Sequence, residues 1–287
     1  MIPLLYHSMN TVVIFTVVCV ILLIWLATLR NPFLALVQMG REMLHSYKFL
    51  VLFVCMFGVL VLNKYELQFE TKMNLSADYT GLFFGFEGHF VRHFQDLFYA
   101  SWLTPVIVFF YVFMLQSVLA ASIGVYLNNK NRLMVYATCY AVIIIYTIAI
   151  PFFLFFPVNE AWSYAPAGVR FLMLDVFPNF EQEYRALSGL NNCFPSLHTA
   201  ISMTMALLAW RSGNRRWIAI TTVTAAVIIF GIFYLGIHWL MDMLGGTVLA
   251  VTASSLAMKL AKVTLQSKDF QVQRKALKSR RPYSYEE

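Results

Sequence analysis

Two short segments of this sequence carry ionisable side chains at the edges of long apolar runs. The first is 194–198, with the sequence Phe-Pro-Ser-Leu-His, and the second is 238–242, with the sequence His-Trp-Leu-Met-Asp. His198 and His238 are 40 positions apart, and a helix needs about 20 residues to cross a bilayer once. One crossing and one return therefore place both histidines on the same membrane face. With Asp242, they would meet a lipid headgroup at the lipid–water boundary.

The first segment has the features of a helix start that could bind a phosphate group. Pro195 suits the first turn of a helix, where its missing N–H costs nothing. The free N–H groups and the positive end of the helix favour an anion there, and the Ser196 hydroxyl adds a further donor. His198 falls in the same turn, where a protonated imidazole could donate its proton to a leaving oxygen.

The second segment pairs an imidazole with a carboxylate. His238 and Asp242 are four residues apart, so on a helix they would share one face. The carboxylate would hold one imidazole nitrogen and leave the other as a nucleophile or base. An Asp inside a membrane segment is expensive and therefore indicates a function. Gly245-Gly246, on the next turn, would permit close packing of neighbouring helices.

A structural zinc site is the other chemistry that these residue types allow, because His and Asp are both zinc ligands. It would need a further ligand, for which Glu160, Asp175 and Cys193 are the candidates. The four cysteines show no paired spacing, so no disulfide framework is predicted. The zinc site therefore stays open as an alternative to a catalytic site.

The composition predicts that these segments are positioned by membrane-spanning helices. The chain has 287 residues, of which 60% are hydrophobic and only 12% charged, about half the charged fraction of a soluble domain. We therefore predict an all-α polytopic membrane bundle of about seven transmembrane helices. The candidate spans are 11–29, 48–63, 102–127, 133–156, 196–210, 217–237 and 239–261.

The basic residues predict the orientation of this bundle. With the N-terminus outside and the C-terminus inside, the cytoplasmic segments hold 16 of the 21 Lys and Arg residues, as the positive-inside rule requires. These segments are 30–48, 128–132, 211–216 and the chain from residue 259. We therefore expect an integral plasma-membrane protein with its active site on the extracytoplasmic face. No soluble domain is predicted that would bind a nucleic acid, so we expect no nucleic-acid partner.

We divide the chain into three parts on the basis of these spans. Residues 1–132 would form N-terminal transmembrane helices with an outer loop at 64–101, and residues 133–262 would form the catalytic helical core. Residues 263–287 would form a basic cytoplasmic tail, which is mainly solvated but could touch anionic lipid headgroups.

The two segments resemble the motifs of the type 2 phosphatidic acid phosphatase superfamily. The Pro-Ser-x-His motif of that family is matched by residues 195–198, and the His-x-x-x-Asp that ends its third motif is matched by His238 and Asp242. The longer strings Phe-Pro-Ser-Leu-His and His-Trp-x-x-Asp-x-x-Gly-Gly most resemble the inositol phosphorylceramide synthase-like branch.

The resemblance implies a role for each residue. His238 would attack phosphorus to form a phosphohistidine, Asp242 would orient His238, and His198 would protonate the departing oxygen. Ser196 would bind phosphate oxygens. The family chemistry implies no metal and no other cofactor.

The sequence departs from the phosphatase pattern in its positive charges. The family arginine six residues before the motif histidine is replaced by Ile232, and the Lys-x6-Arg-Pro motif is absent ahead of residue 195. Arg170 and Arg185, in the segment before the first motif, are the candidates for binding substrate phosphate instead. The synthase-like branch also lacks that arginine, so the departure argues mainly against a simple phosphatase.

These features predict a metal-independent membrane lipid phosphatase or phosphotransferase that acts on a lipid phosphate or pyrophosphate at the outer leaflet. One alternative is a headgroup transferase like inositol phosphorylceramide synthase, in which an alcohol replaces water. The other is a non-enzymatic lipid transporter or scramblase, whose polar residues would normally lie near the bilayer centre. A transporter would move lipid across sealed vesicles without changing it chemically.

Overall fold

The chain forms a bundle of helices in the computed structural model, which describes residues 9–73, 77–183, 185 and 189–279. The α-helices are α2 (Met9–Thr28), α3 (Leu34–His45), α4 (Tyr47–Met73), α5 (Thr80–Glu87), α6 (Phe90–Phe98), α7 (Leu103–Phe109), α8 (Leu115–Asn128), α9 (Arg132–Phe155), α10 (Phe180–Glu183), α11 (Leu197–Ser212), α12 (Arg215–Tyr234) and α13 (Leu240–Ser279). A π-helix, η1 (Phe110–Met114), joins α7 to α8, and three 3-10 turns, η2 (Ala161–Ser163), η3 (Ala165–Ala167) and η4 (Leu172–Asp175), precede α10. No strand occurs among these described residues, so the all-α prediction is confirmed there.

Six helices in the described part of the chain are long and apolar enough to cross a membrane. They are Asn10–Thr28, Tyr47–Glu66, Leu103–Asn128, Arg132–Phe155, Arg215–Tyr234 and Leu240–Gln266. The remaining predicted span, 196–210, forms α11, which has 16 residues and is shorter than the ~20 that a full crossing requires. The basic tail predicted from residue 263 continues α13 as a helix to Ser279, and residues 280–287 lie outside the described residues.

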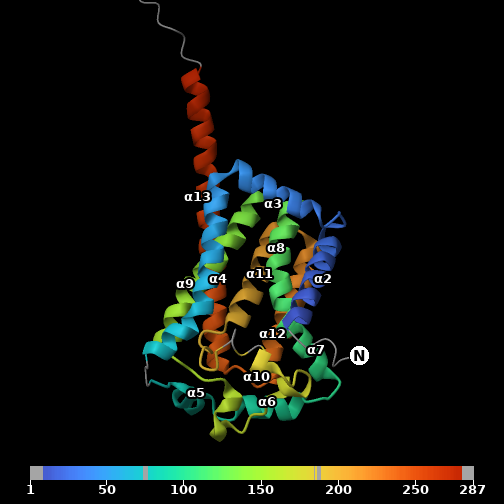
Figure 1. Cartoon of the computed structure of the whole chain (residues 1–287), viewed down its shortest axis with the longest axis vertical. Helices are drawn as coiled ribbons and strands as arrows, with labels where there is room; N and C mark the ends of the chain where they lie inside the picture. The colour runs from blue at the N-terminus through green and yellow to red at the C-terminus, as the bar shows by residue number, and fades with distance from the viewer. Residues whose placement is uncertain (1–8, 74–76, 184, 186–188, 280–287) are drawn as a thin grey trace, which may run out of the picture.

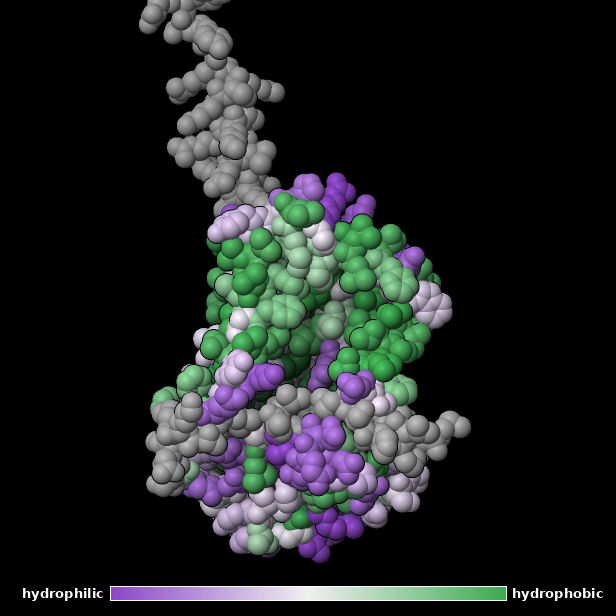
Figure 2. Space-filling view, in the orientation of Figure 1, coloured by the Kyte–Doolittle hydropathy of each residue, from purple (hydrophilic) through white to green (hydrophobic). Residues whose placement is uncertain are grey.

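The long helices lie side by side and alternate in direction along the chain (Figure 1). Helix α3 lies across one end of the bundle, whereas α5, α6 and α10 lie at the opposite end. Figure 2 shows an apolar belt over the long helices and polar side chains gathered towards both ends. This distribution is the one expected of a bundle surrounded by lipid, because apolar side chains facing hydrocarbon need no burial against protein.

The centre of the bundle is formed by α7–η1–α8 and α11. In Leu103–Asn128, 67% of the most apolar 18-residue stretch is buried. In α2 and in the Tyr47–Glu66 part of α4, only 22% of the corresponding stretch is buried, so these helices present their side chains outward. Helix α11 packs against α8, α9, α12 and α13. The short length of α11 therefore does not expose polar backbone to lipid, because longer helices surround it.

Local signals define several helix ends. The Asn131 side chain accepts a hydrogen bond from the Met134 N–H at the start of α9, and Asn214 does the same for Trp217 at the start of α12. Between α11 and α12, Gly213 adopts a left-handed conformation with φ 73°, which glycine adopts without a steric penalty. These caps produce the tight turn that returns the chain across the bundle.

The segment before α11 is tied to the segment before α13 by main-chain hydrogen bonds. The N–H groups of Ala161 and Trp162 donate to the carbonyls of Ile237 and Gly236 at 3.0 and 2.9 Å. Gly236 has φ 77°, and a Cβ there would lie 2.4 Å from the Arg170 carbonyl oxygen, so a larger residue would not fit. The loop at 157–195 thus supports the residues that lead into the second motif.

The glycine pair of α13 packs directly against the first motif. A Cβ on Gly246 would lie 2.6 Å from the Ser196 carbonyl oxygen, and a Cβ on Gly245 would lie 2.5 Å from the Phe194 ring. The absence of side chains at these two positions therefore sets how closely α13 approaches the start of α11, as the sequence suggested.

We expect Gly246→Ala to destabilise the protein by about 1–3 kcal/mol, the usual cost of overpacking a tight contact. The backbone carbonyl of Ser196 cannot move aside as a flexible side chain could. Thermal unfolding in detergent measures the loss. Gly58→Ala is the control, because a Cβ at Gly58 on α4 meets nothing within 4 Å; equal melting temperatures for the two variants would contradict the contact.

Candidate active site

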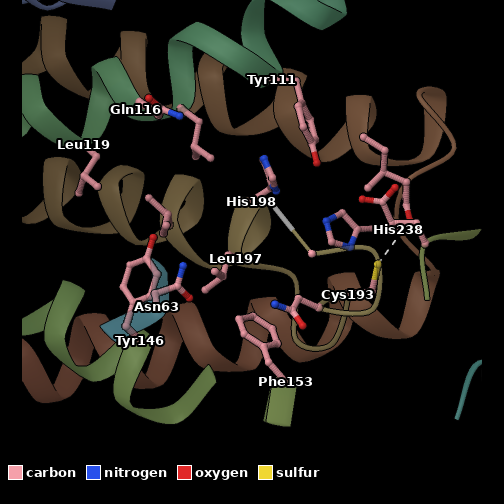
Figure 3. Close-up of a pocket in the computed structure, with 16 residues that line it drawn as sticks. Asn63, Tyr111, Gln116, Leu119, Tyr146, Phe153, Cys193, Leu197, His198 and His238 are labelled. Atoms are coloured by element: carbon pink, nitrogen blue, oxygen red, sulfur yellow. Dashed lines mark hydrogen bonds between the residues drawn. The ribbon is translucent and has the colours of Figure 1, made fainter. Parts of the chain in front are cut away.

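The two histidines of the sequence motifs meet at one end of the bundle, and both line the same cavity (Figure 3). His198 is the second residue of α11, and His238 lies just before α13. Their ring centroids are 5.7 Å apart. The cavity has a volume of about 200 Å³, several times the ~30 Å³ that a water molecule occupies in the liquid. The cavity as a whole therefore has room for a phosphate-sized group next to the two rings.

His238 is paired with Asp242, but not by a shared helix face. Because α13 begins at Leu240, His238 lies outside the helix, and the expectation of a helical i, i+4 pair was wrong in this respect. Asp242, in the first turn, reaches back instead: its Oδ2 accepts from the Trp239 N–H at 2.8 Å and lies 3.3 Å from His238 Nδ1. The pair leaves His238 Nε2 as the nitrogen not engaged by the carboxylate.

The Asp242 carboxylate is fully buried, with no exposed surface. Its second oxygen, Oδ1, has no hydrogen-bond partner among the described residues. A buried carboxylate with an unsatisfied oxygen is costly, so the surrounding structure must hold it in place. A positive charge on His238 would stabilise the buried Asp242 carboxylate.

The first motif caps α11 rather than opening its first turn at proline. Pro195 lies ahead of the helix, and Ser196 is the N-cap, whose Oγ accepts from the Thr199 N–H at 3.3 Å. The expectation that Pro195 belongs to the first turn was therefore wrong. The Ser196 side chain is buried and does not line the cavity, and its N–H donates to the Asp242 carbonyl at 3.1 Å. In this arrangement Ser196 joins the two motifs.

Tyr111 is a site residue that the motifs did not reveal. Its ring stacks on the His198 ring with centroids 3.9 Å apart and an interplanar angle of 16°. Tyr111 lies in the π-helix η1, and such π-bulges in α-helices frequently occur at functional sites. An apolar sequence run carries no signal for a π-helix, so Tyr111 could not have been selected from the sequence.

Glu87 is a second residue that sequence reasoning missed. It ends α5, and its two carboxylate oxygens accept from the Leu240 and Met241 N–H groups, each at 2.6 Å. These are free N–H groups in the first turn of α13, where a negative charge is favourable. Burial raises the pKa of Glu87, and the two N–H donors oppose that rise. Glu87 thereby clamps the helix start that carries Asp242.

Arg185 lies close to the cavity but is already paired. Its guanidinium donates to both oxygens of Glu160, at 2.7 and 3.0 Å, and to both oxygens of Glu181, also at 2.7 and 3.0 Å. Glu160 lines the cavity with His238 and is buried. Burial raises the pKa of the Glu160 carboxyl, and the hydrogen bonds and charge of Arg185 oppose this rise.

Arg170 is placed elsewhere. Its guanidinium lies over the Tyr99 ring, 4.4 Å from the centroid, and it does not line the cavity. The position of the absent family arginine, Ile232, is fully buried, and its carbonyl accepts from the N–H groups of Ile237 and His238. Of the predicted arginines, Arg185 is therefore the one connected to the cavity, through Glu160.

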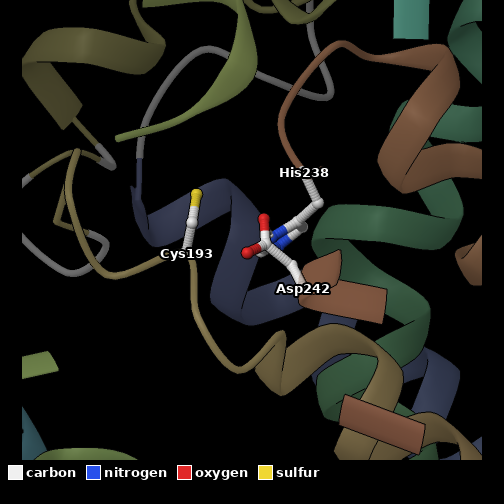
Figure 4. Close-up of side chains that lie close together, drawn as sticks. All are labelled: Cys193, His238 and Asp242. Atoms are coloured by element: carbon white, nitrogen blue, oxygen red, sulfur yellow. Dashed lines mark hydrogen bonds and ion pairs between the residues drawn. The ribbon is translucent and has the colours of Figure 1, made fainter. Parts of the chain in front are cut away.

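Cys193, His238 and Asp242 bring one potential ligand atom each to within 4.8 Å of one another (Figure 4). This spacing resembles part of a metal site. Burial raises the pKa of the Cys193 thiol well above its usual value, which keeps it in the poorly ligating thiol form. Glu160 is held by Arg185, and Asp175 is exposed on η4, so neither of these predicted further ligands joins the group.

The profile of the PAP2 superfamily matches residues 80–256, which is more than half of the chain. This chain belongs to the PAP2 superfamily. Among curated proteins and solved structures, no match was found.

As a member of the PAP2 superfamily, the chain is expected to have phosphatase-type activity. The matched region begins at α5 and ends inside α13, so it contains Glu87 and Tyr111 as well as the two histidines and Asp242. The closer resemblance to the inositol phosphorylceramide synthase-like branch stays a prediction.

We expect Glu87→Gln to loosen the first turn of α13, because an amide offers one acceptor where the carboxylate offers two. Loss of one hydrogen bond to a charged group costs about 1.5–3 kcal/mol, equivalent to roughly tenfold or more in amide exchange. Hydrogen exchange of a peptide covering residues 239–246 measures the loss of amide protection in this turn. Asp96→Asn, which alters an exposed pair with Arg92, is the control; equal protection in both variants would contradict the clamp.

Proposed function

We propose that this protein transfers a phosphoryl group from a membrane lipid phosphate or pyrophosphate, at the outer leaflet, through a phosphohistidine on His238. The observation that carries the proposal is the facing pair of histidines in one cavity, with Asp242 on Nδ1 of His238. An imidazole held by a carboxylate on one nitrogen is an activated nucleophile at the other.

In the first step, His238 Nε2 attacks phosphorus and forms a P–N bond while the bond to the leaving oxygen breaks. The leaving oxygen takes a proton from the His198 imidazolium. His238 becomes positively charged, and the Asp242 carboxylate, which no water reaches, stabilises that charge strongly. Tyr111 supports the His198 imidazolium through the face of its ring.

In the second step, neutral His198 takes a proton from water or from an acceptor alcohol, whose oxygen attacks phosphorus as the P–N bond breaks. Both histidines return to their starting states, so one pair of residues serves both steps. The cavity is larger than a single water requires, which leaves room for an acceptor alcohol. Hydrolysis and headgroup transfer therefore share this mechanism up to the phosphohistidine.

The position of the site supports an outer-leaflet lipid substrate. The start of α11, which carries His198, and the segment before α13, which carries His238, lie towards the end of the bundle opposite α3 (Figure 1). Basic residues gather at the α3 end, where Arg30 bonds to the Asn128 carbonyl and Arg132 pairs with Glu42. Under the positive-inside rule the α3 end is cytoplasmic, which puts the histidines outside. We therefore propose an extracytoplasmic active site, and we propose the plasma membrane as the location of the protein.

Substrate phosphate needs positive charge near the cavity, and Arg185 is the candidate that we favour. It bridges two carboxylates, so an arriving phosphate would compete with Glu181 for one edge of the guanidinium while Glu160 holds the other. Bidentate pairing with phosphate is a common use of arginine. Backbone N–H groups at the start of α11 would supply further donors.

The first test is trapping of the covalent intermediate with a lipid substrate carrying radioactive phosphorus. Wild-type protein should acquire label that is stable in base and labile in acid, as expected of a phosphohistidine, and His238→Ala should acquire none. His198→Ala should lower phosphate release by about 10²–10⁴-fold, the usual contribution of a general acid. Label on His238→Ala at the wild-type level would refute this mechanism.

We expect the double variant Arg185→Met with Glu160→Gln to raise KM for a lipid phosphate more than it lowers kcat. Changing both residues avoids leaving Glu160 charged and unpaired in a buried site, which costs about 3–5 kcal/mol. Steady-state phosphate release measures both constants. Arg170→Met, which removes a cation away from the cavity, is the control; similar KM values for the two variants would contradict a role for Arg185.

A further inference from the structure

The cavity extends beyond the histidines to a group of uncharged polar side chains. Figure 3 shows His198, His238 and Cys193 towards one end and Asn63, Gln116 and Tyr146 towards the other. We call Asn63, Gln116 and Tyr146 the amide arm. These residues come from three different helices, α4, α8 and α9. The proposed chemistry uses none of them.

The amide arm lies within three helices that are apolar enough to cross the membrane. Polar side chains in such segments are expensive and usually serve a function. Oδ1 of Asn63 is buried and has no hydrogen-bond partner among the described residues. One turn further along α4, Glu66 is engaged by the Asn192 amide at 2.8 Å. The arm therefore contains an acceptor that a ligand hydroxyl or amide N–H could satisfy.

The amide arm also lies where the bundle is open to the side. Helices α4 and α8 both pack on α3 and α9, but α4 and α8 do not form a closely packed pair with each other. In the shared orientation of Figures 1 and 2, the surface is hollowed between α4 and α8, in front of α11 and within the apolar belt. Gln116 is exposed there, and Leu119 continues the cavity wall. An acyl chain could leave through this opening into the bilayer.

We infer that the amide arm binds the polar linkage of an acyl lipid, namely the hydroxyl, ester or amide groups between phosphate and hydrocarbon. This inference rests on the proposed function and names the part of the substrate that the cavity recognises. The phosphate lies between the histidines, the linkage bonds to Asn63, Gln116 and Tyr146, and the chain passes between α4 and α8. Two neutral amides and a phenol suit this task, because the linkage carries no charge.

Two probes that share a phosphate and a long chain test this inference. Oleoyl lysophosphatidate carries a carboxylic ester and a hydroxyl between its phosphate and its chain, whereas hexadecyl phosphate carries neither of these two groups. In purified full-length protein, Asn63→Leu and Gln116→Leu should each lower kcat/KM for lysophosphatidate about five- to tenfold more than for hexadecyl phosphate, as expected for one lost hydrogen bond. Because each variant is compared on two substrates, a general loss of folded protein cancels.

Gln38→Leu is the matched control, since Gln38 lies on α3 at the other end of the bundle. It should leave the ratio of the two kcat/KM values at the wild-type level. If both Asn63→Leu and Gln116→Leu also leave that ratio unchanged, the arm does not bind the linkage and the inference is overturned.

A binding measurement separates this inference from the proposed chemistry. In the His238→Ala background, we expect lysophosphatidate to bind more tightly than hexadecyl phosphate, and Asn63→Leu to abolish the difference. Wild-type protein that binds with this preference but turns over neither probe would refute the hydrolase mechanism and support the arm. Equal binding of the two probes would overturn the inference even if both are hydrolysed.

Discussion

The buried carboxylate of Asp242 is the constraint on which the rest of the site depends. With no exposed surface, it must be satisfied by groups of the protein. Oδ2 accepts from the Trp239 N–H and lies 3.3 Å from His238 Nδ1, and the Asp242 main-chain carbonyl accepts from the Ser196 N–H. One residue thus joins the start of α13, the segment before it and the cap of α11. Because His198 follows that cap by two residues, the same connections set the distance between the two imidazoles.

The remaining elements hold this junction from outside. Glu87 occupies the N–H groups of α13 that Asp242 does not use, and Gly246 lets α13 approach Ser196 closely. The π-helix η1 stacks the Tyr111 ring on the His198 ring. Each of these contacts helps to orient His198 or His238. Orientation strongly affects the rate when a nucleophile and an acid must act on the same phosphate group.

The positive charge near the cavity comes from Arg185 and is balanced by two carboxylates. The family arginine is replaced by Ile232, which is packed in the core with its carbonyl bound to the His238 N–H. Arg185, from a different segment, is held near the cavity between Glu160 and Glu181. Such a cation keeps its orientation without substrate, and the two carboxylates limit the positive charge left unpaired in a weakly solvated place.

The sequence alone determined the apolar helical class, the motif residues and the convergence of His198 and His238, because helix rise and bilayer thickness dictate where the chain returns. The short span at 196–210 was visible in the sequence, but the longer helices that surround α11 were not. The sequence also did not determine that His238 would precede its helix, because the reach of Asp242 back to His238 decides that point. Tyr111, Glu87 and the pairing of Arg185 likewise depended on tertiary structure. Tyr111 and Glu87 contact residues far away in the chain, and Arg185 bonds to Glu160 as well as to its neighbour Glu181. A local sequence pattern does not indicate which distant residue will form a given hydrogen bond or ring contact.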